Sequence, residues 1–181
     1  MGIITDFYAG RATDHRCRSL EDYWAFDSDS LEANHDFIQW MFSTVRESGV
    51  GVPAPTLWAE DVREFRASPE LRARLLRSLD LILAFYGLER VEGQPAPEVR
   101  RSAAFGIRSR LWITDRNHNY LRLSRILDST ATLGLEDHSR ALLRCLEGIH
   151  ATHGERIGAC TLSRWRECAR GSVPPGGGGS P

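Results

Sequence analysis

Residues 68–87 read SPELRARLLRSLDLILAFYG and carry the clearest helical pattern in the chain. Ser68 can cap a helix, Pro69 suits its first turn, and Glu70 adds the early acid that a helix N-terminus favours. Apolar side chains then recur at steps of three or four residues, at Leu71, Leu75, Leu79, Ile82 and Tyr86. Gly87 stands where a glycine commonly ends a helix. This stretch predicts one amphipathic helix with a buried face.

Similar signals recur along most of the remaining chain. Capping residues, helical spacing and closing glycines predict further helices, over residues 20–26, 28–45, 56–65, 99–112, 117–133, 137–153 and 157–168. Residues 88–98, with Gly93, Pro95 and Pro97, are expected to form an internal loop, and residues 49–55 a second one. No alternation of period two is long enough to predict a strand. The predicted fold is all-α, a single-domain helical bundle of about six to eight helices.

The length of 181 residues fits one domain, which we place at residues 1–170. Residues 171–181 read GSVPPGGGGSP and are expected to form a flexible Gly/Pro/Ser tail. The four cysteines are too few for a disulfide framework, no apolar run is long enough to span a bilayer, and no signal peptide is evident. These observations predict a cytoplasmic protein with no membrane partner.

All 23 basic residues are arginine, and 24 acidic residues bring the net charge to −1. The absence of lysine excludes a P-loop, a kinase-type phosphate site and Schiff-base chemistry, because each requires a lysine. The near-neutral charge argues against a general nucleic-acid partner. Arginine without lysine is typical of a GC-rich genome, and the chemistry that arginine offers is anion binding, not proton transfer.

Two patterns in the sequence resemble sets of metal ligands. His150 and His153 share a predicted helical face, but no paired cysteine or Cys2His2 spacing accompanies them. Asp27, Asp29 and Glu32 could bind magnesium for a diphosphate, yet their place at a helix start is better explained by capping. We therefore expect no metal site and no cofactor.

Asn34 and His35 are polar residues within or beside an apolar helical stripe. Counting back from Ile38 and Phe42 in helical steps places them there, where an unpaired polar group is costly. One interpretation is that they are buried and fix a helix contact through hydrogen bonds. The alternative is that they line a pocket, with His35 acting as acid or base near neutral pH.

A second polar group lies near the start of the helix predicted over residues 117–133. His118, Arg122 and Arg125 share one face of this helix, and Asn119 borders its apolar stripe. Free N–H groups and the helix dipole favour an anion at such an N-terminus. Two arginines there would form a clamp for a carboxylate or phosphate. The alternative is a solvent-exposed arginine face paired with neighbouring acids.

Charge is segregated between the segments that hold these two groups. Residues 19–45 contain six acids and no arginine, whereas residues 99–127 contain seven arginines and a single acid, Asp115. We infer that the two segments pack side by side, either as a salt-bridge network or as two walls of a polar cleft.

Four blocks of the sequence resemble the opioid growth factor receptor conserved-region family. They are EANHDFIQWMF at 32–42, LAFYG at 83–87, HNYLRLSRIL at 118–127 and LGLE at 133–136. Ser43 departs from the proline usual in that family, and the stretch around Cys17 matches loosely. The resemblance implies an all-helical domain and, in the animal members, binding of an enkephalin-type opioid peptide. We expect a minimal, bacterial single-domain relative and do not extend the peptide activity to it.

We expect a ligand-binding domain whose cleft takes an anionic or amphipathic small molecule or peptide. The predicted ligand-binding residues are Asn34, Gln39, Trp40, Tyr86, Trp112, Asn119, Arg122 and Arg125. An alternative is a cofactor-independent enzyme of specialised metabolism that uses the same cleft. His35 and His118 would be its catalytic acid and base, and Asp36 would orient an imidazole. A third possibility is a protein-interaction module in which these residues are structural.

Overall fold

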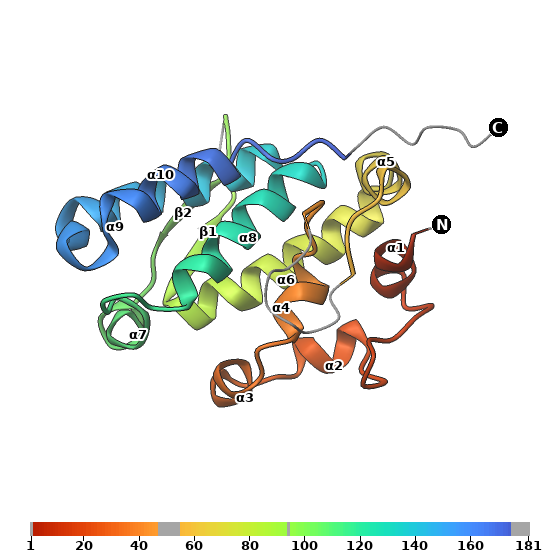
Figure 1. Ribbon diagram of the computed structural model, residues 1–181, viewed down its shortest axis with the longest axis horizontal. Helices are drawn as coiled ribbons and strands as arrows, with labels where there is room; N and C mark the ends of the chain where they lie inside the picture. Colours follow the sequence, from red (N-terminus) through yellow and green to blue (C-terminus); the bar gives the residue numbers. More distant parts are fainter. Residues whose placement is uncertain (1, 47–54, 94, 175–181) are drawn as a thin grey trace.

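The computed structural model describes residues 2–46, 55–93 and 95–174 (Figure 1). These residues form ten helices and one two-stranded antiparallel sheet. In chain order the elements are α1 (Ile3–Tyr8), α2 (Leu20–Trp24), α3 (Ser28–Ala33), α4 (Phe37–Met41), α5 (Ala59–Ala67), α6 (Pro69–Tyr86), β1 (Leu88–Val91), β2 (Glu98–Arg101), α7 (Phe105–Trp112), α8 (Asn119–Thr132), α9 (Glu136–Ile157) and α10 (Ala159–Cys168). The predicted all-α class is confirmed. None of the described helices is long and apolar enough to cross a membrane.

Helix α6 forms as its sequence predicts. The hydroxyl of Ser68 accepts a hydrogen bond from the backbone N–H of Leu71 at 3.2 Å, and Pro69 lies in the first turn. The apolar face from Leu71 to Tyr86 is buried. Gly87 ends the helix in the left-handed conformation, with a φ of 75°. Capping, apolar spacing and termination therefore agree along this helix.

Figure 1 shows α6 crossing the middle of the molecule, with α8, α9 and α10 on one side and α1 to α4 on the other. On the first side, α8 packs against α9 and α10, and β2 lies against α9. On the second side, aromatic rings join the short helices. The ring of Phe7 lies 5.8 Å from that of Tyr23 and 5.2 Å from that of Trp40, and Tyr8 lies 5.1 Å from Phe65. One hydrophobic core connects both sides.

The described residues contain more helices than the six to eight that the sequence predicts. One addition is α1. The other arises because the helix predicted over residues 28–45 is divided into α3 and α4. At the division Asn34 is extended, with φ −98° and ψ 119°. Apolar residues keep their helical spacing across the break, so the sequence pattern does not reveal it.

A β-hairpin occupies the region predicted as a loop at residues 88–98. Strands β1 and β2 pair so that Leu88 lies opposite Arg101. Within the two strands only Leu88 and Val99 are buried, so the alternation of buried and exposed residues is too short to predict a strand. Strand β2 also takes the start of the helix predicted over residues 99–112, and α7 begins after it.

The first residues of the predicted tail lie against α8. The backbone N–H of Ser172 donates to the hydroxyl of Thr132 at 2.8 Å. This contact gives the start of the predicted tail a place in the fold. Residues 175–181 of the tail, and most of the loop predicted at 49–55, lie outside the described residues.

Replacing Gly87 with alanine is expected to lower the free energy of unfolding by more than about 1 kcal/mol. The left-handed backbone disfavours a side chain, and a Cβ here would lie 2.7 Å from the Cα of Phe105. Gly106→Ala in α7 is the matched control, because nothing lies within 4 Å of its Cβ position and alanine favours a helix. Urea unfolding followed by circular dichroism measures both. Equal losses would contradict the role given to Gly87.

Candidate functional site

Arg122 of α8 reaches across to the junction between α3 and α4. Its Nη1 lies 3.5 Å from the carbonyl oxygen of Leu31, while its Nη2 lies 3.4 Å from the carbonyl oxygen of Asn34 and 2.8 Å from Nδ1 of His35. The guanidinium also lies 5.5 Å from the ring centroid of Phe37. Arg122 is only 6% exposed. We call this contact the Arg122 clamp, because neutral acceptors on one segment hold a buried cation from another.

Asn119, the first residue of α8, is completely buried. Its Oδ1 accepts hydrogen bonds from the hydroxyl of Tyr86 at 3.1 Å and from Arg122 at 3.3 Å. Its Nδ2 donates to Asn117 at 3.0 Å. The indole of Trp112 donates to the backbone carbonyl of Tyr86 at 3.1 Å. Asn119, Tyr86 and Trp112, predicted to bind ligand, therefore lie in the packed core where α6, α7 and α8 meet.

The two predicted histidines lie together. The ring centroids of His35 and His118 are 5.4 Å apart in an edge-to-face arrangement. An arginine N–H can only donate, so Nδ1 of His35 must accept from Arg122, which places the His35 proton on Nε2. In this state His35 has no free lone pair. Acid–base chemistry at His35 would therefore require loss of the Arg122 contact.

His118 has a different environment from His35. Its Nε2 lies 3.8 Å from a carboxylate oxygen of Glu32. Partial burial and the charge of Arg122 lower the pKa of His118 below its ordinary value, although Glu32 opposes this effect. The folded protein thus favours the neutral form of this imidazole.

Asp36 contacts the segment between α1 and α2. Its carboxylate accepts a hydrogen bond from Arg18 at 2.7 Å and lies 3.6 Å from Nε2 of His15. Burial raises the pKa of Asp36, but Arg18 lowers it more, so the pKa is below its ordinary value. The described contacts of the Asp36 carboxylate are with Arg16, Arg18 and His15, and none is with His35 or His118. Asp14, His15 and Asp36 place possible metal-ligand atoms within 4.8 Å of one another, but Arg18 already bonds both carboxylates and would repel a cation.

Asn34, Gln39 and Trp40, also predicted to bind ligand, support the break between α3 and α4. The amide of Asn34 donates to a carbonyl one turn earlier in α3 at 2.8 Å. With its amide nitrogen turned toward them, Gln39 donates to two carbonyls just before α4 at 2.8 and 2.9 Å. Trp40 is buried among the aromatic rings of the N-terminal helices. Their contacts are with local backbone groups and the core.

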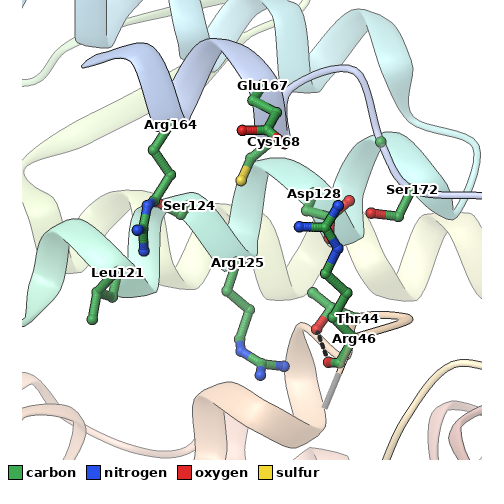
Figure 2. A pocket seen from close by; sticks show the side chains of 11 residues that line it. Thr44, Arg46, Leu121, Ser124, Arg125, Asp128, Arg164, Glu167, Cys168 and Ser172 are labelled. Carbon is green, nitrogen blue, oxygen red and sulfur yellow. Dashed lines mark hydrogen bonds between the residues drawn. The ribbon is translucent and has the colours of Figure 1, made fainter. Parts of the chain in front are cut away.

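Arg125 differs from the other residues predicted to bind ligand because it borders an open depression of about 390 Å³ (Figure 2). It donates to the carbonyl of Phe42 at 3.2 Å and makes no other hydrogen bond or ion pair with the part of the chain that the structure describes. Burial lowers the pKa of Arg125 below its ordinary value, and nearby Asp128 opposes this effect. A guanidinium carries five N–H donors, so most donors of Arg125 have no acceptor in the described part of the chain.

Two arginines that the sequence analysis did not select border the same space. Arg46 follows α4 and Arg164 lies on α10, and Figure 2 shows both around the depression with Arg125. They lie far from Arg125 in sequence and belong to no motif, so no sequence signal distinguishes them. A second depression of about 290 Å³ shares Leu121, Ser124 and Arg164 with the first and extends to His118. Together the two depressions follow one side of α8.

Comparison with known proteins identifies the family. Residues 8–156 match the opioid growth factor receptor (OGFr) conserved region. The chain belongs to this family. It is 40% identical over 121 residues to the opioid growth factor receptor of Mus musculus and to that of Homo sapiens, covering 67% of this chain and 19% and 17% of those receptors. It is 32% identical over 123 residues to opioid growth factor receptor-like protein 1 of Rattus norvegicus, covering 67% of this chain and 25% of that relative.

The aligned part of this chain thus spans about a fifth of the length of the receptors that it matches. No solved structure matches the chain. Two blocks that carry the family resemblance, residues 32–42 and 118–127, are the segments that the Arg122 clamp joins. The clamp therefore connects the two segments of this chain whose charges the sequence shows to be segregated.

Arg122→Lys is expected to lower the free energy of unfolding by about 2 kcal/mol, because each buried carbonyl left without a donor costs about 1–3 kcal/mol. A single ammonium group cannot reach the carbonyls of Leu31 and Asn34 together with His35. Arg144→Lys, at an exposed position of α9, is the control. Urea unfolding measures both variants, and a loss no larger than that of the control would contradict the clamp.

His118 is expected to make the folded state less stable on acidification. Its folded-state pKa lies below 6.5, so the unfolded chain takes up the proton first and stability falls as the pH drops through about 6.5. His118→Gln removes this proton uptake. Between about pH 8 and about pH 5, the melting temperature of the wild type should fall more than that of the variant. Parallel pH profiles would show that His118 titrates equally in both states.

Proposed function

We propose that this domain binds a ligand through an anionic group, which the depression beside Arg125 receives. The observation that carries the proposal is Arg125 itself. Its described polar contact is one neutral carbonyl, although burial lowers its pKa. A partly buried cation is costly unless a charge or several acceptors compensate it. An oxyanion in the depression would provide that compensation.

The surroundings of Arg125 support the same interpretation. Arg46, Arg125 and Arg164 come from three separate segments and border one space. None of the three forms an ion pair within the described ranges, in contrast to Arg18 or Arg90, which bind carboxylates. Guanidinium groups bind carboxylates and phosphates through paired N–H donors. Several such groups around one space favour an oxyanion over a neutral ligand.

The second depression indicates what the rest of the ligand contacts. It continues along α8 past Leu121, which is 56% exposed, toward Tyr120 and His118. This end combines an apolar side chain with an aromatic ring and an imidazole. An amphipathic small molecule or peptide, with its anionic group at Arg125 and a less polar body along α8, fits both depressions.

The names of the relatives also support ligand binding. The Mus musculus and Homo sapiens proteins are named receptors for an opioid growth factor. The alignments cover about a fifth of those proteins, so we carry over ligand binding in general and not that ligand.

All four cysteines are free, which suits a reducing compartment, and we propose a cytoplasmic location.

The proposal is tested with citrate and pyrophosphate as polyanionic probes, at an ionic strength matched with sodium chloride. Each probe should raise the melting temperature of the wild type, since a ligand at 100 times its Kd stabilises a fold by about 2.7 kcal/mol. Arg125→Gln should lose most of this shift while remaining folded, because it removes an uncompensated charge.

Arg110→Gln is the matched control for this experiment, since Arg110 is exposed on α7 and does not border either depression. It should retain the shift of the wild type. A full shift in Arg125→Gln, or an equal loss in both variants, would contradict the proposed site.

A further inference from the structure

Asp128 gives the Arg125 depression an acidic wall. It lies one turn beyond Arg125 on α8, is 8% exposed, and borders the same space. Figure 2 shows Arg46 beside it. The carboxylate accepts a hydrogen bond from the hydroxyl of Thr132 at 3.3 Å, and no cation lies within 4.0 Å of it in the described part of the chain. A buried carboxylate thus lies on the same space as Arg46, Arg125 and Arg164.

The groups around Asp128 do not fully compensate the negative charge of its carboxylate. Arg46 and Arg125 attract the carboxylate, while Glu167 on α10 borders the same space and is exposed. Burial raises the pKa of Asp128 more than these arginines and the hydroxyls of Thr132 and Ser172 lower it, so the pKa is above its ordinary value. The carboxylate is therefore poorly solvated and is a strong acceptor for a proton.

An anion in the depression is subject to opposing electrostatic forces near Asp128. The arginines attract it, but the carboxylate of Asp128 repels any oxygen that carries negative charge and no proton. A proton between the two oxygens removes the conflict, because an O–H···O⁻ hydrogen bond is short and about twice as strong as a neutral one. The depression therefore favours an oxyanion that brings its own O–H group.

We propose that the depression selects a protonated phosphate group, whose P–OH donates to Asp128 while its other oxygens accept from Arg46, Arg125 and Arg164. This inference rests on the proposed function and names the chemical class of the anionic group. Sulfate has the same size and shape but carries no proton near neutral pH. Asp128 is then the repulsive element that separates two anions which the arginines alone would bind alike.

Isothermal titration of the full chain with inorganic phosphate and with sulfate, at pH 7 and constant ionic strength, tests the proposal. The wild type should bind phosphate at least about tenfold more tightly than sulfate, which corresponds to about 1.4 kcal/mol. Asp128→Asn should gain sulfate affinity and bring the ratio near one, because its amide can donate to sulfate. Glu167→Gln, which removes the exposed acid of the same depression, should keep the ratio of the wild type.

Two outcomes separate this inference from the proposed function. Equal binding of phosphate and sulfate by the wild type, abolished for both by Arg125→Gln, would overturn the role of Asp128 and leave anion binding intact. Binding of neither ion would also overturn the inference, while the citrate and pyrophosphate shifts decide the proposed function. If Asp128→Asn does not fold, the ratio of phosphate affinity to sulfate affinity in the wild type still decides the test. Asp128→Ser then provides a second variant without the carboxylate.

Free phosphate and a phosphomonoester share the chemistry that Asp128 would select, and pH separates them. The phosphate of phosphoserine loses its last proton with a pKa of about 6, whereas inorganic phosphate retains one far above neutral pH. Phosphoserine should therefore bind at about pH 5.5 and lose at least about tenfold in affinity by pH 8. Inorganic phosphate should lose less over this range. Equal affinity of phosphoserine at both pH values would contradict a proton shared with Asp128.

Discussion

Arg122 supplies the hydrogen-bond donors that the break between α3 and α4 requires. Where the chain leaves α3, the carbonyls of Leu31 and Asn34 accept from Arg122 in a buried and a part-buried contact, and a buried carbonyl without a donor is costly. The donors come from α8, which is distant in sequence. The guanidinium of Arg122, whose N–H donors have a fixed planar geometry, thus joins the N-terminal helices to the C-terminal ones. The position of His35, and the proton on its Nε2, follow from this contact.

The same helix uses its next arginine differently. Arg122 donates to two carbonyls, an asparagine and a histidine, whereas Arg125 donates to one carbonyl and borders an open depression. Both residues have the same chemistry and lie about one turn apart. What separates them is the number of protein acceptors within reach. The arginine with more acceptors holds the fold together, and the arginine with fewer is left to bind an anion.

Local patterns in the sequence predict helices well and long-range contacts poorly. The cap at Ser68 and the glycine at 87 determine α6, because both act within one turn of the helix. The break at Asn34 depends on Arg122, and apolar spacing continues through it, so periodicity cannot reveal it. The charge segregation predicts that the segments of His35 and His118 lie side by side, and the motif selects Arg125, but neither pattern predicts that the two rings meet. Arg46 and Arg164 meet Arg125 only through tertiary packing, which no local pattern encodes.

The net charge of −1 does not reveal how the charges of the two segregated segments are paired. Three acids of the N-terminal segment form contacts near their own positions and not with the arginines of α8. Asp36 binds Arg18, and Asp22 and Asp27 cap their own helices. On α8, Arg122 and Arg125 instead contact backbone carbonyls, an asparagine and an imidazole, so a nearly neutral chain has arginines around one depression that form no ion pair in the described ranges. In that depression a single buried carboxylate, Asp128, has a large effect, since its charge is weakly solvated and faces the same space as the arginines.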